Sequence, residues 1–159
     1  MSSKIKITLW GLSMLVIILL IIGSLVISHS PSSSISHSGC VAKQFNVGSS
    51  GQCVQDIQTM VNYMETAGLN ECPFASAKIL SVSGNYDQAT AQQITSVQNW
   101  ERCYSKQEGS QSNILATGIV NTQTWHLLCS YAYLFPSKSK SYTSPYRQES
   151  IAAGKNAGC

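Results

Sequence analysis

Apolar residues recur at steps of three and four in three separate stretches of the chain. In the first stretch, four of them mark one helix face: Val54, Ile57, Val61 and Met64. This spacing predicts a helix over about 52–66, with Gly68 beyond its end as a stop signal.

The second and third stretches carry shorter stripes. Ala91, Ile94 and Val97 predict a helix that ends near Trp100 or Glu101. A third helix would turn three residues inward: Trp125, Leu128 and, at its end, Tyr131. Between the first two helices, residues 79–82 form a short apolar segment that either pairs as a strand or packs on the helices.

The remaining polar stretches divide the chain. Residues 29–39 are a Ser-rich tether with too few large apolar residues to bury, and residues 106–113 are a polar loop. From 136 to 159 the chain is rich in Ser, Lys and Tyr without periodicity, which predicts a disordered basic tail. The folded domain is therefore expected over 40–135.

Residues 1–28 are predicted to be a signal anchor. The apolar stretch from Ile7 to Ile27 has 21 residues, enough to span a hydrocarbon layer of roughly 30 Å as a helix. Lys4 and Lys6 precede it, which places the N-terminus in the cytoplasm and the rest of the chain outside. A signal peptide cleaved near residues 28–30 is the alternative, and the protein would then be secreted.

Six cysteines agree with export: Cys40, Cys53, Cys72, Cys103, Cys129 and Cys159. An even number in a small exported domain predicts disulfides, with the pairing left open. Cys159, on the predicted tail, is expected to be unpaired or intermolecular. Cysteine and histidine do not cluster at ligand spacing, so no metal site is expected.

The charge excludes one class of partner. The net charge of +3 comes from the anchor flank and the tail, because the 40–135 stretch has four basic and six acidic residues. A nucleic-acid-binding surface needs clustered Lys and Arg on the folded part, so no nucleic-acid partner is expected.

Two stretches follow one template: residues 84–90 (GNYDQAT) and 118–124 (GIVNTQT). Each has a Gly, then an Asp or Asn suited to cap a helix, then a Thr, and each precedes an apolar stripe. The template residues are therefore predicted to be structural: Gly84, Asp87, Thr90, Gly118, Asn121 and Thr124.

The chain resembles the small three-helix peptidoglycan-binding domains of cell-wall hydrolases. The matching segments, in order, are 48–51 (GSSG), 54–58 (VQDIQ), 83–90 (SGNYDQAT), 97–98 (VQ) and 117–128 (TGIVNTQTWHLL). The resemblance implies a mainly α domain that binds wall polymer, and the six cysteines predict that disulfides staple it.

The chain departs from the family pattern at the template turns. The family has an Asp directly before the first Gly of the turn, where this chain has Ser83 and Thr117. It has a Pro directly after the cap position, where this chain has Gln88 and Thr122. The helix-starting geometry survives these changes because Asp and Asn remain as caps.

Four aromatic residues are candidates to stack on sugar rings: Tyr86, Trp100, Tyr104 and Trp125. In the family, the positions of Tyr86 and Trp125 are mostly apolar core, and core is the favoured interpretation for these two. Gln58 and Gln98 end matching stripes and are expected to hydrogen-bond to loop backbone.

No catalytic constellation emerges from the sequence. Residues 36–40 (SHSGC) resemble the nucleophile motif of L,D-transpeptidases with an extra Ser, and Cys40 is interpreted as a structural half-cystine. Glu101 and Glu108 are interpreted as solvated surface, and His126 as a surface or packing residue.

Together these features predict an exported, single-pass membrane protein whose domain binds peptidoglycan or a muropeptide without catalysis or a cofactor. The alternative is the same fold used to contact another exported protein without glycan binding. A wall hydrolase is disfavoured because the chain has no second domain to carry the chemistry.

Overall fold

The first apolar stripe forms helix α2, Gln52–Thr66, over the residues that the periodicity predicts. The computed structural model describes residues 39–67, 72, 78–138 and 144–159, all of which belong to one unit, Ser36–Cys159. The predicted anchor, nearly all of the tether and Gly68 lie outside the described residues. Within those ranges, no helix combines the length and apolarity needed to cross a membrane.

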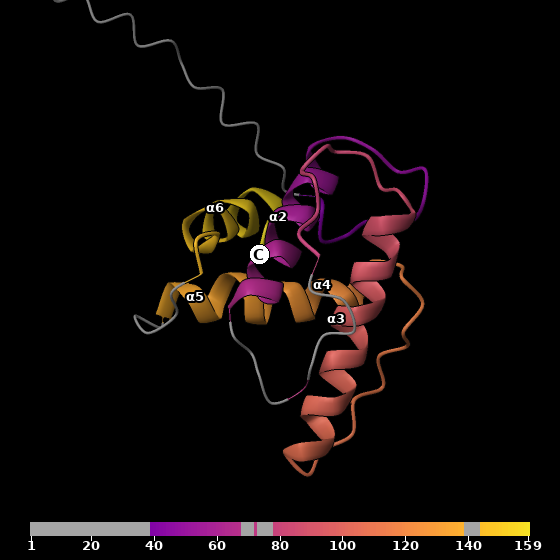
Figure 1. Cartoon of the computed structure of the whole chain (residues 1–159), viewed down its shortest axis with the longest axis vertical. Helices are drawn as coiled ribbons and strands as arrows, with labels where there is room; N and C mark the ends of the chain where they lie inside the picture. The colour runs from indigo at the N-terminus through magenta and orange to yellow at the C-terminus, as the bar shows by residue number, and fades with distance from the viewer. Residues whose placement is uncertain (1–38, 68–71, 73–77, 139–143) are drawn as a thin grey trace, which may run out of the picture. The chain divides into compact units, whose positions relative to one another are not determined.

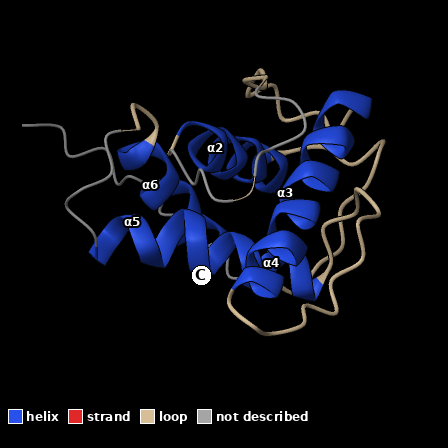
Figure 2. Ribbon diagram, turned by 60° about the horizontal axis from the view of Figure 1, so that its bottom comes forward, coloured by secondary structure: helices blue, strands red, loops and turns tan. Residues whose placement is uncertain are grey.

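The fold is mainly helical, as predicted. After α2 come α3 (Gln88–Gln107), α4 (Thr122–Leu128), a π-helix η1 (Cys129–Leu134), α5 (Phe135–Lys138) and α6 (Arg147–Ala157). Helix α2 lies between α6 and α3, and the continuous α4–η1–α5 segment crosses beside it (Figure 1). Figure 2 shows helices and loops only, and the described β-pairing is limited to two isolated antiparallel bridges, Phe45 with Val120 and Ser50 with Asn85.

The core forms around α2. All four residues of its apolar stripe are fully buried: Val54, Ile57, Val61 and Met64. Asn62, also buried, accepts from the backbone N–H of Leu80 at 2.8 Å and donates to its carbonyl at 3.0 Å. Among residues 79–82, Leu80 is buried whereas Ile79 and Val82 are exposed, so this segment packs on α2 instead of pairing as a strand.

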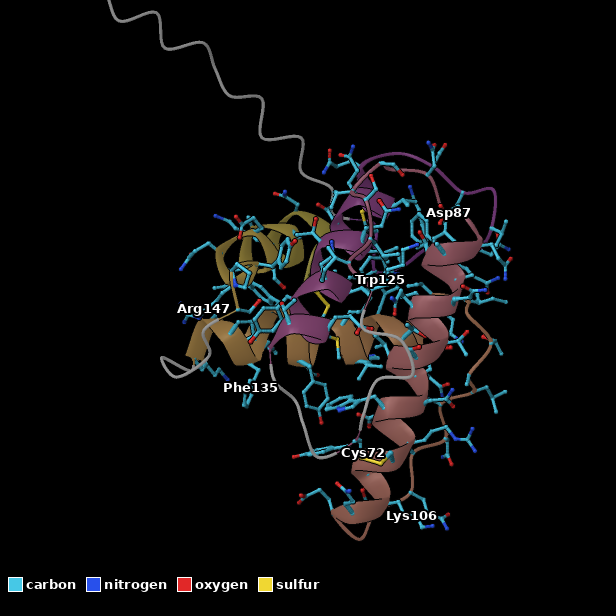
Figure 3. All side chains as sticks on the ribbon, viewed as in Figure 1. Cys72, Asp87, Lys106, Trp125, Phe135 and Arg147 are labelled. Carbon is cyan, nitrogen blue, oxygen red and sulfur yellow. A yellow bond between two sulfur atoms is a disulfide. The ribbon has the colours of Figure 1, made fainter. Side chains whose placement is uncertain are left out.

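Helix α3 continues two turns beyond its predicted end near Trp100. Cys103 forms a disulfide with Cys72, which lies beside the lower part of α3 (Figure 3). Tyr104 stacks on Trp100 with ring centroids 5.2 Å apart. These contacts fix a stretch that lacks an apolar stripe of its own, and the helix ends at Gln107 where Gly109 follows with a left-handed φ of 70°.

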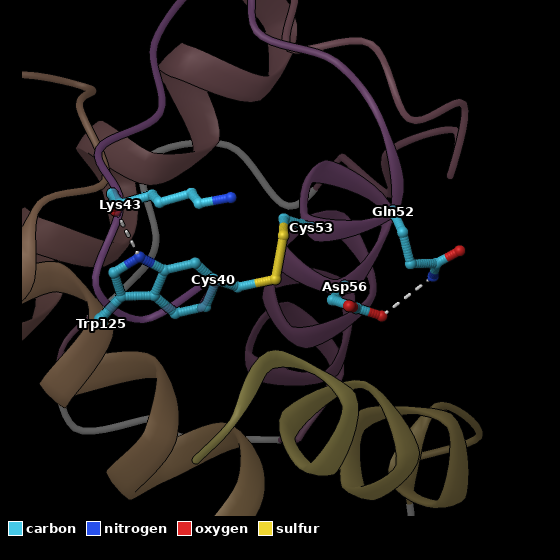
Figure 4. The surroundings of a disulfide bond; sticks show 6 residues. All are labelled: Cys40, Lys43, Gln52, Cys53, Asp56 and Trp125. Atoms are coloured by element: carbon cyan, nitrogen blue, oxygen red, sulfur yellow. Dashed lines mark hydrogen bonds between the residues drawn. A yellow bond between two sulfur atoms is a disulfide. The ribbon is translucent and has the colours of Figure 1, made fainter. Parts of the chain in front are cut away.

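The segment before α2 is fastened to the rest of the domain by a disulfide and by several hydrogen bonds. Cys40 is bonded to Cys53 in α2, and the Trp125 ring N–H donates to the carbonyl of Lys43 at 2.9 Å (Figure 4). The backbone of Phe45 exchanges two 2.9 Å hydrogen bonds with that of Val120. Cys40 is therefore a structural half-cystine, as interpreted from the sequence.

The prediction of a disordered tail over 136–159 is wrong for its described part. Helix α6 lies against η1 and α2 and buries one small-residue face: Ser150, Ala153, Gly154 and Ala157. The Ser150 hydroxyl donates to the carbonyl of Ala132, and Gly154 lies directly against Tyr133. A stripe of small residues lacks the hydrophobic contrast that marks an amphipathic helix, which is why the periodicity did not reveal α6.

Three disulfides link the described residues, and the expectation for Cys159 was wrong. Cys159 pairs with Cys129 in η1, which fastens the end of α6 to the rest of the domain. The other two bonds are Cys40–Cys53 and Cys72–Cys103. Three intact disulfides indicate that the domain works in a non-reducing environment.

Candidate functional site

The template residues start helices, as predicted. The Asp87 carboxylate accepts from the backbone N–H and the hydroxyl of Thr90, both at 2.8 Å, at the start of α3. Asn121 accepts in the same way from Thr124, at 3.0 and 3.2 Å, at the start of α4. These hydrogen bonds from Thr90 hold the pKa of Asp87 below its usual range.

Buried glutamines hold both template turns. The Gln58 side-chain oxygen accepts from the N–H of Gly84 at 3.0 Å, and its amide donates to the Asn85 carbonyl and the Thr90 hydroxyl. Both Gln58 and its partner Thr90 are at most 1% exposed. Hydrogen bonds from Gln58 in α2 therefore hold the first template turn, as the sequence led us to expect.

Gln98 repeats this arrangement in the second copy. Its side-chain oxygen accepts from the N–H groups of Thr117 and Gly118, at 2.9 and 3.0 Å. Its amide donates to the Ile119 carbonyl and the Thr124 hydroxyl, both at 2.9 Å. Because all of these groups are committed within the protein, the template turns build the fold and leave ligand chemistry to other residues.

Three of the four candidate stacking residues are not available to a ligand, and for Trp100 the expected exposure was wrong. Tyr86, Trp100 and Trp125 are only 2–3% exposed. The Tyr86 hydroxyl donates to the Gly118 carbonyl at 2.8 Å, and burial raises the pKa of this phenol. Tyr86 and Trp125 are core residues, which was the favoured interpretation of both.

The fourth candidate, Tyr104, is half-buried in an aromatic cluster between α3 and η1. It stacks on Trp100, and Tyr131 meets both rings edge-on, at centroid distances of 4.8 Å from Trp100 and 5.9 Å from Tyr104. Tyr131 also lines an open groove. The cluster therefore supports one wall of that groove from behind.

This groove, called the first groove below, has a volume of about 350 Å³ and lies between α3, α4, η1 and the 112–114 segment. It is lined by Glu101, Ser112, Asn113, Ile114, Gln123, His126, Leu127, Ser130 and Tyr131. Asn113, Gln123, His126 and Ser130 are exposed, so their amide, imidazole and hydroxyl groups are accessible. The lining combines several neutral hydrogen-bonding groups with a single carboxylate.

The first groove holds one phenol donor and one carboxylate. The pKa of the Tyr131 phenol is raised to about 12, mainly by burial and secondly by the negative charge of Glu101. The phenol therefore remains a hydrogen-bond donor at neutral pH. One Glu101 oxygen accepts from the Ser105 hydroxyl at 2.9 Å. The other is buried and has no hydrogen-bond partner among the described residues.

The π-helix η1 gives this wall its local geometry. It follows α4 directly and carries Ser130 and Tyr131 to the first groove. π-Helical turns are rare and occur frequently at functional sites, because they displace side chains from the regular helical positions. The sequence around Cys129–Leu134 carries no recognised signal for this conformation, so sequence reasoning missed it.

A second groove, of about 320 Å³, adjoins the first at α4 and η1. Its lining residues are Val41, Thr122, Trp125, His126, Cys129, Ser130, Leu134, Gly158 and Cys159. Alkyl groups and the Cys129–Cys159 disulfide give it a more apolar surface than the first groove. His126 and Ser130 line both grooves.

Sequence reasoning placed Glu101 on the solvated surface, interpreted His126 as a surface or packing residue and turned Tyr131 inward, but it assigned none of the lining residues to a groove. His126 is indeed exposed, whereas Glu101 is half-buried in the groove wall. In the described ranges, His, Cys, Asp and Glu do not gather in a group that could hold a metal ion. Comparison of the chain with protein-family models, curated proteins and solved structures finds no match.

Proposed function

We propose that this protein is a non-catalytic, exported and membrane-anchored peptidoglycan-binding protein, and that the first groove holds the wall polymer. The observation that carries the proposal is the lining of this groove: exposed amides and hydroxyls beside a protonated phenol. Acetamido sugars and peptide bonds present the complementary donors and acceptors. Because the groove is open, a polymer could lie across it without being threaded.

The resemblance to peptidoglycan-binding domains supports the proposal through the roles of the matched residues. In both template copies the cap residue, the Thr and the Gly take part in one repeated turn that starts a helix. Gln58 and Gln98, which end two further matched motifs, clamp these turns. The motif order therefore corresponds to a consistent set of structural roles.

The membrane placement rests on the sequence and on the disulfides. Residues 1–28, predicted as a signal anchor, would hold the domain at the outer face of the membrane, where disulfides persist and wall polymer is within reach. No cofactor is needed, since hydrogen bonding and surface contact suffice for binding.

Co-sedimentation of the full chain with purified peptidoglycan tests this proposal. The detergent-solubilised protein, with its disulfides confirmed by mass spectrometry, should pellet with the wall polymer and show no lysis in zymography. The full chain is required because a fragment that ended at residue 135 would lose α6 and Cys159. If the intact protein stays in the supernatant, the wall-binding proposal fails and the protein-contact alternative gains support; if it lyses the wall, it is not a non-catalytic binder.

A further inference from the structure

The two grooves meet on one helix. His126 lies in α4, and Ser130 follows it in η1, which continues α4 directly. Both are exposed and both line the first and the second groove. The grooves are therefore adjacent surfaces joined across this pair, and one molecule can occupy both.

The linings of the two grooves differ in chemistry. The first presents a carboxylate, amides and hydroxyls. The second presents Val41, Leu134 and the Cys129–Cys159 disulfide beside a few polar groups. Leu134 is 41% exposed, a large fraction for a leucine, and its side chain is available to an apolar group.

The volumes and charges of the two grooves restrict the size and chemistry of the ligand further. Each groove, at about 350 and 320 Å³, is at the small end of the range for ligand sites, so each suits one part of a larger molecule. Neither lining contains Lys or Arg, and the one acidic side chain among them is Glu101. The linings therefore offer no cationic side chain to pair with an anion, so binding would rest on hydrogen bonds in the first groove and on apolar contacts in the second.

We propose that the two grooves form a single two-part site for a glycopeptide: the glycan portion lies in the first groove, and a short peptide with small alkyl side chains lies in the second. The link between the two portions crosses His126 and Ser130. This inference rests on the proposed wall-binding function and adds that the peptide portion is recognised as well as the glycan. The peptide is assigned to the second groove because that surface is continuous with the first and offers the apolar contacts that the first lacks.

Titration calorimetry of the full chain with three soluble probes tests the two-part site. The probes are a peptide-free wall disaccharide, its stem peptide alone, and the intact disaccharide-peptide. We expect the intact probe to bind at least about tenfold more tightly than either half, because tethering makes the second contact intramolecular. Equal affinity for the disaccharide and the intact probe would overturn the two-part site but leave the proposed function standing, whereas no binding of any probe would overturn both.

A matched pair of variants localises the peptide portion. Leu134→Ser should weaken binding of the intact probe by about tenfold and leave disaccharide binding unchanged, because it removes an apolar contact from the second groove only. Leu115→Ser is the control, since Leu115 is 69% exposed and lines neither groove. Equal weakening of both probes by Leu134→Ser, or no effect on either, would contradict the assignment; circular dichroism verifies that both variants are folded.

Discussion

At the residue scale, single buried polar side chains hold the turns that support the site. Gln98 joins α3 to the backbone that leads into α4, and α4 in turn carries Gln123 and His126 into the first groove. Sequence reasoning could assign this role to Gln98 because a polar residue ending an apolar stripe must find a buried partner. It could not assign Glu101 or Asn113 to a groove, because nothing local to those residues marks a cavity formed by distant segments.

Replacing Gln98 with Leu should destabilise the domain strongly. The substitution leaves the buried N–H of Gly118 without its acceptor, at a cost of about 1–3 kcal/mol in the free energy of unfolding, whereas the N–H of Thr117 keeps a second acceptor in the Leu115 carbonyl. Gln92→Leu, at an exposed position of the same helix, should change it by less than about 0.5 kcal/mol. Urea denaturation measures both, and equal effects would contradict the clamp.

Glu65 should make stability depend on pH. Both of its carboxyl oxygens are buried without a hydrogen-bond partner among the described residues, and burial raises its pKa from 4.5 to about 7. At a pH between these two pKa values, Glu65 keeps its proton in the folded state and has lost it in the unfolded chain. The free energy of unfolding should therefore fall as pH rises from about 4.5 to about 7.

The variant Glu65→Gln isolates this effect from other titrating groups. We compare the Tm of the variant minus the Tm of the unchanged protein at two pH values. This difference should be larger at pH 8 than at pH 4, because the variant no longer carries a group that ionises in a buried position. Thermal unfolding followed by circular dichroism at the two pH values provides the measurement. A Tm difference that is the same at both would contradict a raised pKa.

At the scale of elements, a helix could be predicted from the sequence only where it carries a stripe of large apolar residues. The bounds of α2 followed from its four buried apolar residues, and the starts of α3 and α4 followed from Asp87 and Asn121. The last two turns of α3 and all of α6 were missed because they are held by disulfides, aromatic stacking and small residues. Such contacts depend on partners far along the chain, which a local pattern cannot specify.

Because α6 packs closely on η1, replacing Gly154 with Ala should destabilise the domain, although helix propensity alone predicts a stabilisation. Gly154→Ala would normally favour a helix by about 1 kcal/mol, but here the new Cβ would lie 2.4 Å from the Cβ of Tyr133. We expect a net loss of about 1–3 kcal/mol in the free energy of unfolding. Ala152→Gly, at an exposed position of α6, is the control and should cost only the propensity difference. A stabilising Gly154→Ala would show that α6 does not pack on η1 as described.

At the scale of the whole molecule, the disulfides differ in accessibility. Cys40 and Cys72 are each 1% exposed, whereas neither cysteine of the Cys129–Cys159 bond is buried and both line the second groove. This bond should therefore be the first to be reduced by a mild thiol. Alkylation and peptide mapping over time would detect it, and earlier labelling of Cys72 or Cys40 would contradict the expectation.

Removing the same bond should loosen α6 from the domain. It closes a loop with a sequence separation of 30, for which chain entropy gives a stabilisation of about 3–4 kcal/mol. The double variant Cys129→Ser/Cys159→Ser should have a correspondingly lower free energy of unfolding in urea. An unchanged value would mean that packing alone holds α6.

The central claim is that the first groove binds peptidoglycan, and a matched pair of double variants tests it most directly. Asn113→Ala/Gln123→Ala removes two exposed amides from the groove, and Gln92→Ala/Asn99→Ala removes two exposed amides from α3 outside both grooves. In a co-sedimentation binding curve with the full chain and purified peptidoglycan, the groove variant should bind at least about tenfold more weakly, and the control should match the unchanged protein. Equal binding by all three proteins would contradict the claim.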